Sequence, residues 1–301
     1  TRLLCMLLIL FLAPAMAQPL TEESVLYQPH RGSPGDPPPG VREIWLKASD
    51  GTQLQAWWLA PAKQGVSSVV YFHGNGGNLN SCRSTVEIYR QLGLGLLAFD
   101  YRGYGLSGGT PGEAGLYLDG LAAYDFCRQK SGRIYLHGYS LGGAVASLVA
   151  TQRQTAGLVL ESTFTDVRSL ASLRFGMLAA LQVKSEFNTL DRIKALRCPI
   201  LIFHGTLDTT IPVELGKKLH QETRNSSQFC LVEGAGHGNL RHRLGPTYLD
   251  KLRKFFCDGP TSYTQYPKTT PTIQADKLLS SFLKKLSTGR VARQPRGQAA
   301  L

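Results

Sequence analysis

The hydrophobic positions of this chain fall into short runs separated by polar and glycine-rich stretches. From residue 95 onward, most runs are continuously apolar instead of alternating, and this pattern predicts strands that are buried on both faces of a parallel sheet. These runs are Gly95 to Phe99, Arg133 to His137, Leu158 to Glu161, Ile200 to His204 and Phe229 to Val232.

Three earlier runs have strand character, and helical spacing appears between the later ones. The early runs are Glu43 to Lys47, Leu54 to Leu59 and Ser68 to Phe72; the helical stretches include Leu116 to Gln129, Leu141 to Thr151 and Val213 to Glu222. Asp50-Gly51 predicts a hairpin between the first two strands. An antiparallel opening followed by alternating strands and helices predicts an α/β fold, with a doubly wound, mostly parallel sheet of about eight strands flanked by helices.

Residues 166–197 separate two predicted strands and also carry apolar side chains at helical spacing. These are Leu170, Leu173, Met177, Leu178 and Leu181. The pattern fits either an ordinary crossover helix or a small lid over a site, and the sequence favours neither.

The two ends of the chain differ from its middle. Arg2, the apolar run Leu3 to Leu12 and the small-residue site Ala15-Met16-Ala17 predict a signal peptide over residues 1–17, with an uncleaved anchor as the alternative. Residues 18–40 are rich in Pro and Gly and predict an extended arm. We therefore expect a signal peptide at 1–17, one domain at 18–258 and a basic tail at 259–301, in an exported protein that is periplasmic or secreted.

The net charge of +12 says little about partners, because the tail alone carries seven Lys and Arg against one Asp. No recognition motif accompanies this charge, so nucleic-acid binding is not expected. Within the tail, Lys277 to Leu286 places five apolar residues on one helical face. That pattern fits either peripheral contact with an anionic membrane or a loosely docked tail.

A nucleophile motif follows one of the predicted buried strands. Gly138-Tyr139-Ser140-Leu141-Gly142 is a G-x-S-x-G elbow, and it opens a helix rich in Ala, Val and Leu, which is the strand–turn–helix setting that this motif requires. The helix N-terminus favours negative charge developing beside it. The motif predicts that Ser140 is a catalytic nucleophile.

A serine nucleophile needs a base, and the base needs an acid that orients it. Asp208 lies in the loop after Ile200 to His204, and His237 lies in the loop after Phe229 to Val232. This chain order of serine, acid and histidine fits the elbow, so we predict Asp208 as the acid and His237 as the base. Asp166, which follows the preceding strand, is the better of two rival acids, the other being Glu233.

An oxyanion hole requires two backbone N–H donors. We expect Leu141, directly after the nucleophile, to provide one, and Asn75, in the loop that follows Phe72, to provide the other. Neither glycine-rich loop of the chain matches a nucleotide-binding fingerprint, so phosphate binding is not expected. In the second of these loops, Asp100 and Arg102 are expected to pair and brace the site.

Together these motifs resemble the α/β-hydrolase-domain proteins, a group whose members include protein depalmitoylases and lysophospholipid lipases. The matching stretches are HGNGGN at 73–78, DYRGYGLSGG at 100–109, GYSLGG at 138–143, ESTF at 161–164, HGTLDTTIP at 204–212 and GAGHGN at 234–239. The resemblance implies the α/β-hydrolase fold with at most a small lid. It also places Ser140, Asp208 and His237 on the triad positions, and Asn75 and Leu141 on the oxyanion positions.

Two departures narrow the resemblance. Tyr139 stands where many relatives carry Arg or another residue, and the cysteine-rich acylated N-terminus of the depalmitoylase members is absent. The resemblance therefore favours an exported esterase of the bacterial type.

The sequence thus predicts a serine hydrolase that cleaves carboxylic ester or thioester bonds of a small-molecule or lipid substrate through an acyl-enzyme, without a metal or organic cofactor. One alternative is a peptidase of the prolyl-oligopeptidase type, which shares the elbow but usually carries a large additional domain. Another is a non-catalytic binding module on a hydrolase scaffold, which usually lacks a triad member.

Overall fold

The computed structural model describes residues 22–258, except residue 64 and residues 224–226. The predicted signal peptide and the basic tail lie outside these residues, and so does the membrane-binding hypothesis for the tail. Among the helices described, none is long and apolar enough to cross a membrane.

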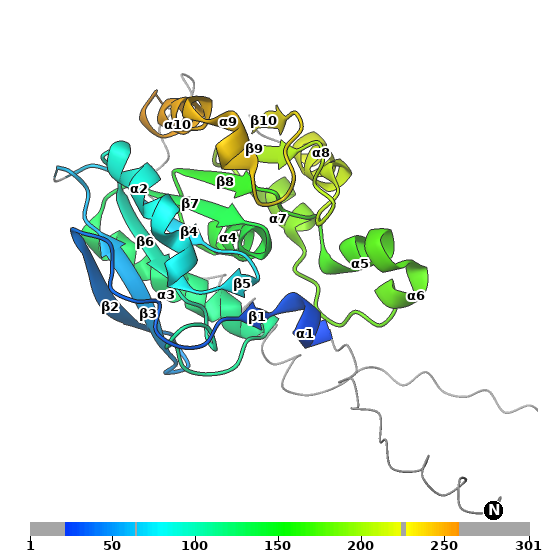
Figure 1. The fold of residues 1–301 in the computed structure, drawn as a ribbon, viewed down its shortest axis with the longest axis horizontal. Coiled ribbons are helices and arrows are strands. Elements are labelled where there is room, and N and C mark those ends of the chain that lie inside the picture. The colour runs from blue at the N-terminus through cyan, green and yellow to red at the C-terminus, as the bar shows by residue number, and fades with distance from the viewer. Residues whose placement is uncertain (1–21, 64, 224–226, 259–301) are drawn as a thin grey trace, which may run out of the picture.

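Eight strands form the central sheet, in the spatial order β10-β9-β8-β7-β4-β6-β3-β2 (Figure 1). The six strands from β10 to β6 run parallel, whereas β3 pairs antiparallel with β6 and with β2. The strands are β2 Val41–Lys47, β3 Gln53–Leu59, β4 Ser68–Phe72, β6 Gly95–Phe99, β7 Ile134–Tyr139, β8 Gly157–Glu161, β9 Ile200–Gly205 and β10 Ser227–Val232. The predicted mostly parallel sheet of about eight strands is confirmed.

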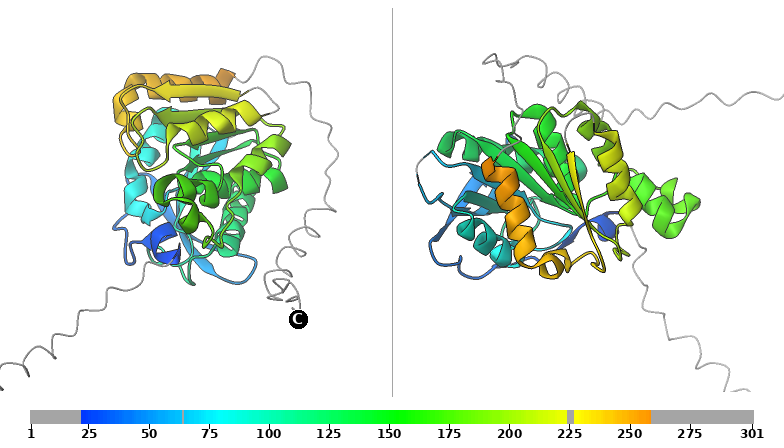
Figure 2. Two further views of the ribbon diagram at one scale, coloured as in Figure 1. Left: turned by 90° about the vertical axis from the view of Figure 1, so that its right-hand side faces the viewer. Right: turned by 90° about the horizontal axis from the view of Figure 1, so that it is seen from above.

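Helices cover both faces of this sheet (Figure 2). One face is covered by α3, α4, α7 and α8, and the other by α2, α9 and α10. These helices are α2 Arg83–Gln91, α3 Glu113–Lys130, α4 Leu141–Gln152, α7 Thr189–Ala195, α8 Val213–Glu222, α9 Leu240–Leu244 and α10 Pro246–Arg253. Side chains alternate along a strand, so Val70 and Phe72 of β4 enter the first core while Val69 and Tyr71 enter the second.

Several shorter elements complete the fold. They are α1 Glu22–Leu26, β1 Gln28–Pro29, β5 Gly76–Gly77, a 3₁₀ turn at Leu79–Cys82, α5 Val167–Phe175, α6 Met177–Ala180 and a π-helical turn at Lys254–Asp258. The strands β1 and β5 form a separate two-stranded parallel sheet. In Figure 1, α1 and the pair α5–α6 lie on the same side of the molecule.

Both interpretations of residues 166–197 describe part of that segment. The helix α7 packs against α4 and α8, as a crossover helix does. The helices α5 and α6 stand away from the sheet and form a small cap, in which several apolar side chains are exposed to solvent. The exposed side chains are Leu173, Phe175, Met177, Leu178 and Leu181.

Two of our expectations were wrong. The run Phe229 to Val232 is not buried on both faces, because β10 is an edge strand and Leu231 is 45% exposed. Asp100 and Arg102 do not pair. Arg102 instead binds Asp119 on α3 at 2.8 Å, whereas the carboxylate of Asp100 lies 3.6 Å from the ring of His73. The side chains of these two nearby turn residues point in different directions, which their proximity in the sequence does not reveal.

The packing of α3 against the sheet generates a prediction at Gly120. A Cβ added there would lie 2.9 Å from Phe72 and 3.0 Å from Val149. We expect Gly120→Ala to lower the free energy of unfolding by about 1–3 kcal/mol, because overpacking outweighs the better helix propensity of alanine. Urea unfolding measures the change. Gly132→Ala is the control, since no atom lies within 4 Å of its added Cβ, and an equal loss in both variants would contradict the prediction.

Candidate active site

Ser140 occupies a sharply bent turn between β7 and α4. Its φ angle is +53°, in the left-handed region that residues other than glycine rarely adopt. The Ser140 N–H donates to the carbonyl of Glu161 at 2.9 Å, and the hydroxyl of Thr163 donates to the Ser140 carbonyl at 2.7 Å. Strand β8 and the residues that follow it therefore hold both sides of the bend.

The glycines that flank Ser140 are required by close backbone contacts. A Cβ at Gly138 would lie 2.5 Å from the carbonyl oxygen of Gly142, and a Cβ at Gly142 would lie 2.1 Å from the carbonyl oxygen of Phe72. Any larger residue at either position would displace the main chain. The G-x-S-x-G spacing is thus a packing requirement of this bend.

The structure brings Ser140, His237 and Asp208 together from three separate loops. His237 Nε2 lies 3.1 Å from Ser140 Oγ, and His237 Nδ1 lies 2.8 Å from Asp208 Oδ2. The second carboxylate oxygen of Asp208 accepts the backbone N–H groups of Thr210 at 2.9 Å and Ile211 at 2.8 Å. The hydroxyl, imidazole and carboxylate therefore form one continuous chain of hydrogen-bonding groups, the arrangement by which a base removes a proton from a serine.

The environment of Asp208 favours its carboxylate form. Burial alone would raise the pKa of Asp208, but the hydrogen bond and charge interaction with His237 and the Ile211 amide outweigh burial and lower it. His204 lies behind the carboxylate at 3.6 Å and bonds the Ile211 carbonyl at 2.9 Å. Burial lowers the pKa of His204, so a neutral ring supports the loop that carries Asp208.

Asn75 and Leu141 both line the cavity beside Ser140. Leu141 is the first residue of α4, and the first N–H groups of a helix have no partner within it. Asn75 is held from three directions: its carbonyl accepts the Gln28 N–H at 2.8 Å and the Tyr104 hydroxyl at 2.8 Å, and its side chain donates to Val25 at 3.3 Å. The loop bearing Asn75 is therefore fixed next to the nucleophile.

Asp166, the rival acid, caps a helix instead of contacting the base. The side chain of Asp166 caps the N-terminus of α5 by accepting the Ser169 N–H at 2.7 Å. The carboxylate that contacts His237 is that of Asp208.

Tyr139 contacts more of this site than its place in the motif suggested. Its hydroxyl donates to the backbone carbonyl of His237 at 3.2 Å, and its ring lies 5.3 Å from the imidazole. A Cβ added to Gly74 would lie 3.1 Å from the same ring. Tyr139 thus touches both the base and the loop of Asn75. The sequence marked it only as a departure from relatives.

A buried ion pair supports the site from behind. Arg241, four residues after His237, bonds the carboxylate of Glu161 at 2.7 Å, and Nε2 of His137 on β7 lies 3.0 Å from the same carboxylate. Burial alone would raise the pKa of Glu161, but Arg241 and His137 outweigh it and hold that pKa well below its usual range. One carboxylate therefore joins the nucleophile strand to the segment of the base. Sequence reasoning missed this pair, although Glu161 begins the ESTF motif.

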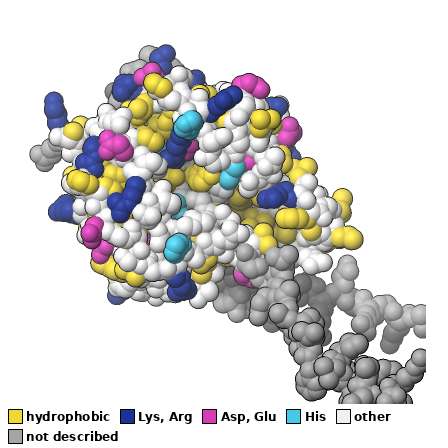
Figure 3. Space-filling view, viewed as in Figure 1, with side chains coloured by type: hydrophobic (Ala, Val, Ile, Leu, Met, Phe, Trp, Pro, Cys, Tyr) yellow, Lys and Arg dark blue, Asp and Glu magenta, His cyan; other side chains and the backbone are white. Residues whose placement is uncertain are grey.

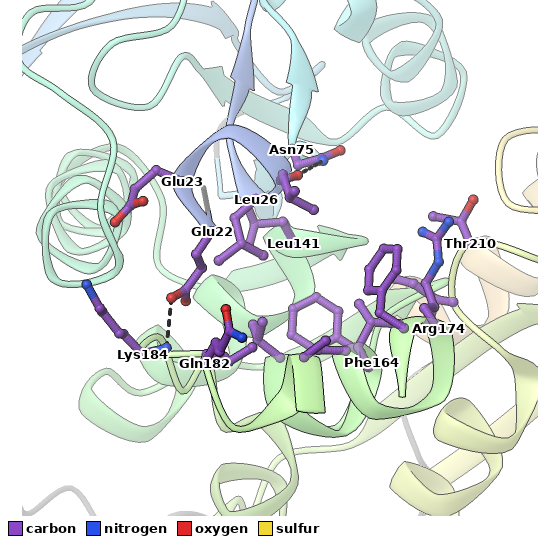
Figure 4. Close-up of a pocket in the computed structure, with 18 of the residues that line it drawn as sticks. Glu22, Glu23, Leu26, Asn75, Leu141, Phe164, Arg174, Gln182, Lys184 and Thr210 are labelled. Atoms are coloured by element: carbon purple, nitrogen blue, oxygen red, sulfur yellow. Dashed lines mark hydrogen bonds between the residues drawn. The ribbon is translucent and has the colours of Figure 1, made fainter. Parts of the chain in front are cut away.

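A cavity of about 490 Å³ opens beside Ser140. Its walls come mainly from apolar side chains of α1, α4 and the α5–α6 cap, with charged groups among them (Figure 4). The lining residues include Leu26, Leu141, Phe164, Val167, Leu170, Phe175, Val183 and Ile211, together with the charged Glu22, Glu23, Arg174 and Lys184. Figure 3 shows apolar side chains gathered on the same side of the surface. A mostly apolar cavity of this volume suits a small organic ligand.

Within the part of the chain that the structure describes, no group of three or more His, Cys, Asp or Glu side chains is placed to hold a metal ion. The four cysteines with described side chains, Cys82, Cys127, Cys198 and Cys230, are buried and unpaired.

Comparisons with known proteins agree with this architecture. Residues 64–189 match the family described as serine aminopeptidase, S33, and residues 177–265 match the family described as TAP-like protein. An uncharacterized protein of Mycobacterium tuberculosis is 30% identical over 226 residues, which is 73% of this chain and 80% of that protein. The lysophosphatidylserine lipase ABHD12 of Macaca fascicularis is 31% identical over 230 residues, 67% of this chain and 57% of the lipase.

Solved structures show the same fold. The esterase Pf2001 of Pyrococcus furiosus superimposes with a TM-score of 0.65 at 21% identity, over 76% of this chain and 96% of the esterase. At this identity the likeness concerns the arrangement of strands and helices.

The Glu161–Arg241 pair generates a stability prediction. We expect Glu161→Gln to lower the free energy of unfolding at pH 7 by about 2–4 kcal/mol, because Arg241, whose side chain is only 23% exposed, would lose its counter-charge. The pKa of Glu161 is lowered in the folded protein. Ionised Glu161 therefore stabilises the fold above the ordinary pKa of 4.5, and this stabilisation is lost progressively as the pH falls below 4.5. The difference in the free energy of unfolding between wild type and variant should therefore become smaller below pH 4.5.

Urea unfolding at pH 7 and at about pH 3.5 tests both parts of this prediction. Glu87→Gln is the matched control, because the Glu87–Arg90 pair lies at the surface, with the carboxylate side chain 56% exposed, and such pairs contribute about 0–1 kcal/mol. A gap that stays constant with pH would show that Glu161 does not act through its charge.

Proposed function

Because this chain belongs to the α/β-hydrolase family, we propose that it is a serine hydrolase that cleaves carboxylic ester or thioester bonds, with Ser140 as nucleophile, His237 as base and Asp208 as acid. The observation that carries the proposal is the continuous contact of these three side chains, at 3.1 Å and 2.8 Å, at the wall of an apolar cavity. The match to a lysophosphatidylserine lipase is consistent with an acyl ester as substrate.

The reaction proceeds in two steps. His237 Nε2 takes the proton of Ser140 as Oγ attacks the substrate carbonyl, and Asp208 stabilises the imidazolium that forms. The N–H groups of Leu141 and Asn75 stabilise the negative charge on the carbonyl oxygen. The protonated His237 then gives its proton to the leaving alcohol or thiol. Water, deprotonated by His237, attacks the acyl-enzyme; the bond to Ser140 Oγ then breaks, His237 returns the proton to Oγ, and the acid is released.

The cavity supports an apolar acyl group as one half of the substrate. Its walls are mostly apolar, while Glu22, Glu23, Arg174 and Lys184 supply charge among them. An acyl chain would bury apolar surface against those walls, and each buried methylene stabilises a complex by about 0.8 kcal/mol. The chain therefore combines an acyl pocket with an acyl-transfer centre.

We also propose that it acts as an exported enzyme, as the signal peptide predicted at residues 1–17 implies.

A peptidase is the second candidate, because one of the matching families is described as serine aminopeptidase, S33. The same triad geometry serves amide and ester bonds. Ester and thioester leaving groups depart more readily than amines, and the apolar cavity suits an acyl chain. We therefore place peptide hydrolysis second.

We expect the wild-type protein to react with a fluorophosphonate probe and to hydrolyse p-nitrophenyl esters faster than aminoacyl anilides. Ser140→Ala should abolish labelling and lower kcat by about 10⁶-fold, since a serine nucleophile has no substitute in the site. Mass spectrometry detects the labelled protein, and kinetics on a panel of esters and anilides compare the two substrate classes. Labelling of Ser140→Ala would refute the nucleophile, faster anilide cleavage would favour the peptidase, and an unlabelled wild type would favour a binding module.

Substituting each of the two candidate acids in turn by asparagine distinguishes their roles. Asp208→Asn should lower kcat by about 10⁴-fold, because an amide cannot hold the imidazole in the required tautomer or stabilise its charge. Asp166→Asn should leave kcat within about twofold, since asparagine also caps helices well. Steady-state kinetics of both variants on one ester decide the matter; the reverse ranking would assign the acid to Asp166.

A further inference from the structure

The cavity beside Ser140 has a wall that is remote in sequence from the rest of the site. Residues 22–32, which we call the N-terminal arm, begin with α1, and Glu22, Glu23, Val25 and Leu26 of α1 line the cavity. Figure 4 shows α1 on one side of the cavity and the cap on the other, with Leu26 beside Leu141. The sequence predicted an extended arm here, which is wrong for Glu22–Leu26 because these residues form the helix α1, and it gave the arm no part in the site.

The arm is joined to the loop that bears Asn75. Strand β1 pairs in parallel with β5, with Gln28 opposite Gly76 and Pro29 opposite Gly77. The Gln28 N–H donates to the Asn75 carbonyl at 2.8 Å, and the His30 N–H donates to the Gly77 carbonyl at 3.0 Å. The arm therefore adds a strand to the loop that we expect to supply an oxyanion donor.

The other end of the arm is joined to the cap segment. The two carboxylate oxygens of Glu22 accept the backbone N–H groups of Lys184 and Ser185, both at 2.7 Å. Figure 4 shows the bond to Lys184. Hydrogen bonds to a charged acceptor are about twice as strong as neutral ones. Tyr27 is buried, and its ring packs on that of Phe187 with 6.4 Å between centroids. These contacts hold α1 in a fixed position across from α5 and α6.

We propose that the N-terminal arm is a specificity-determining part of the active site, in which α1 forms the wall that binds the distal part of a long acyl chain. Leu26 sets the free space between α1 and the wall formed by Leu141, and Glu22 holds α1 against the cap. The inference rests on the proposed acyl-ester hydrolysis for its substrate class. The contacts that carry it concern the cavity and not the triad.

Binding of free fatty acids to the Ser140→Ala protein tests the arm without requiring turnover. In that background we compare dodecanoate with butanoate by calorimetry, for the unaltered protein and for Leu26→Trp, Glu22→Ala and Asp36→Ala. Leu26→Trp fills the cavity and Glu22→Ala releases α1, so both should weaken dodecanoate binding by about tenfold or more while butanoate binding changes by less than about twofold. Asp36→Ala, which removes an exposed carboxylate that does not line the cavity, should behave like the unaltered arm.

The same substitutions in the active enzyme should lower kcat/KM for p-nitrophenyl dodecanoate, through KM, and leave the butanoate ester and the fluorophosphonate labelling rate unchanged. Equal effects on both chain lengths, no effect on either, or no binding of dodecanoate to the Ser140→Ala protein would overturn the inference. A wild type that hydrolyses no ester would overturn the proposed function alone, because the binding series still tests the arm. Thermal unfolding checks each variant, and Glu22→Ala decides if Leu26→Trp does not fold.

Discussion

The bend of the main chain at Ser140 is the constraint on which the site depends. A φ of +53° at a residue with a side chain costs about 1–3 kcal/mol, and it persists because its surroundings leave no alternative. The neighbouring strand accepts the Ser140 N–H, Thr163 donates to its carbonyl, and the two flanking glycines lie against backbone atoms. The parallel sheet thus holds the hydroxyl at its edge, and every other group must be brought to that point.

Those groups arrive from loops that follow neighbouring parallel strands. Parallel strands end at the same edge, and loops at that edge are where open α/β sheets place their ligands. Asp208 follows β9, His237 follows β10 and Asn75 follows β4, so three loops converge on Ser140 without any long connection. Behind them, Glu161 fixes the segment after His237 through Arg241. The site is therefore rigid because it is built on strand ends and supported by a buried charge pair.

Much of this arrangement could be predicted from the sequence. Continuous apolar runs located the buried strands, and Ser68 to Phe72 and Gly95 to Phe99 match β4 and β6 residue for residue. The elbow motif and the chain order located the three side chains that the structure brings together. Contacts between remote segments could not be predicted in this way. Neither the partner of Arg102 nor the position of α1 over the cavity is encoded in local pattern, because both depend on which surfaces meet after folding.

The contact between Glu22 and Lys184 has a consequence for the order in which the site is assembled. These residues are 162 positions apart, and closing so long a loop costs chain entropy that only later contacts can offset. During synthesis the arm leaves the ribosome before the sheet does, yet the backbone amides that Glu22 binds are made only after six strands of the central sheet, from β2 to β8, have been translated. The nascent chain therefore contains the nucleophile turn before it contains the amides that hold this wall of the cavity in place.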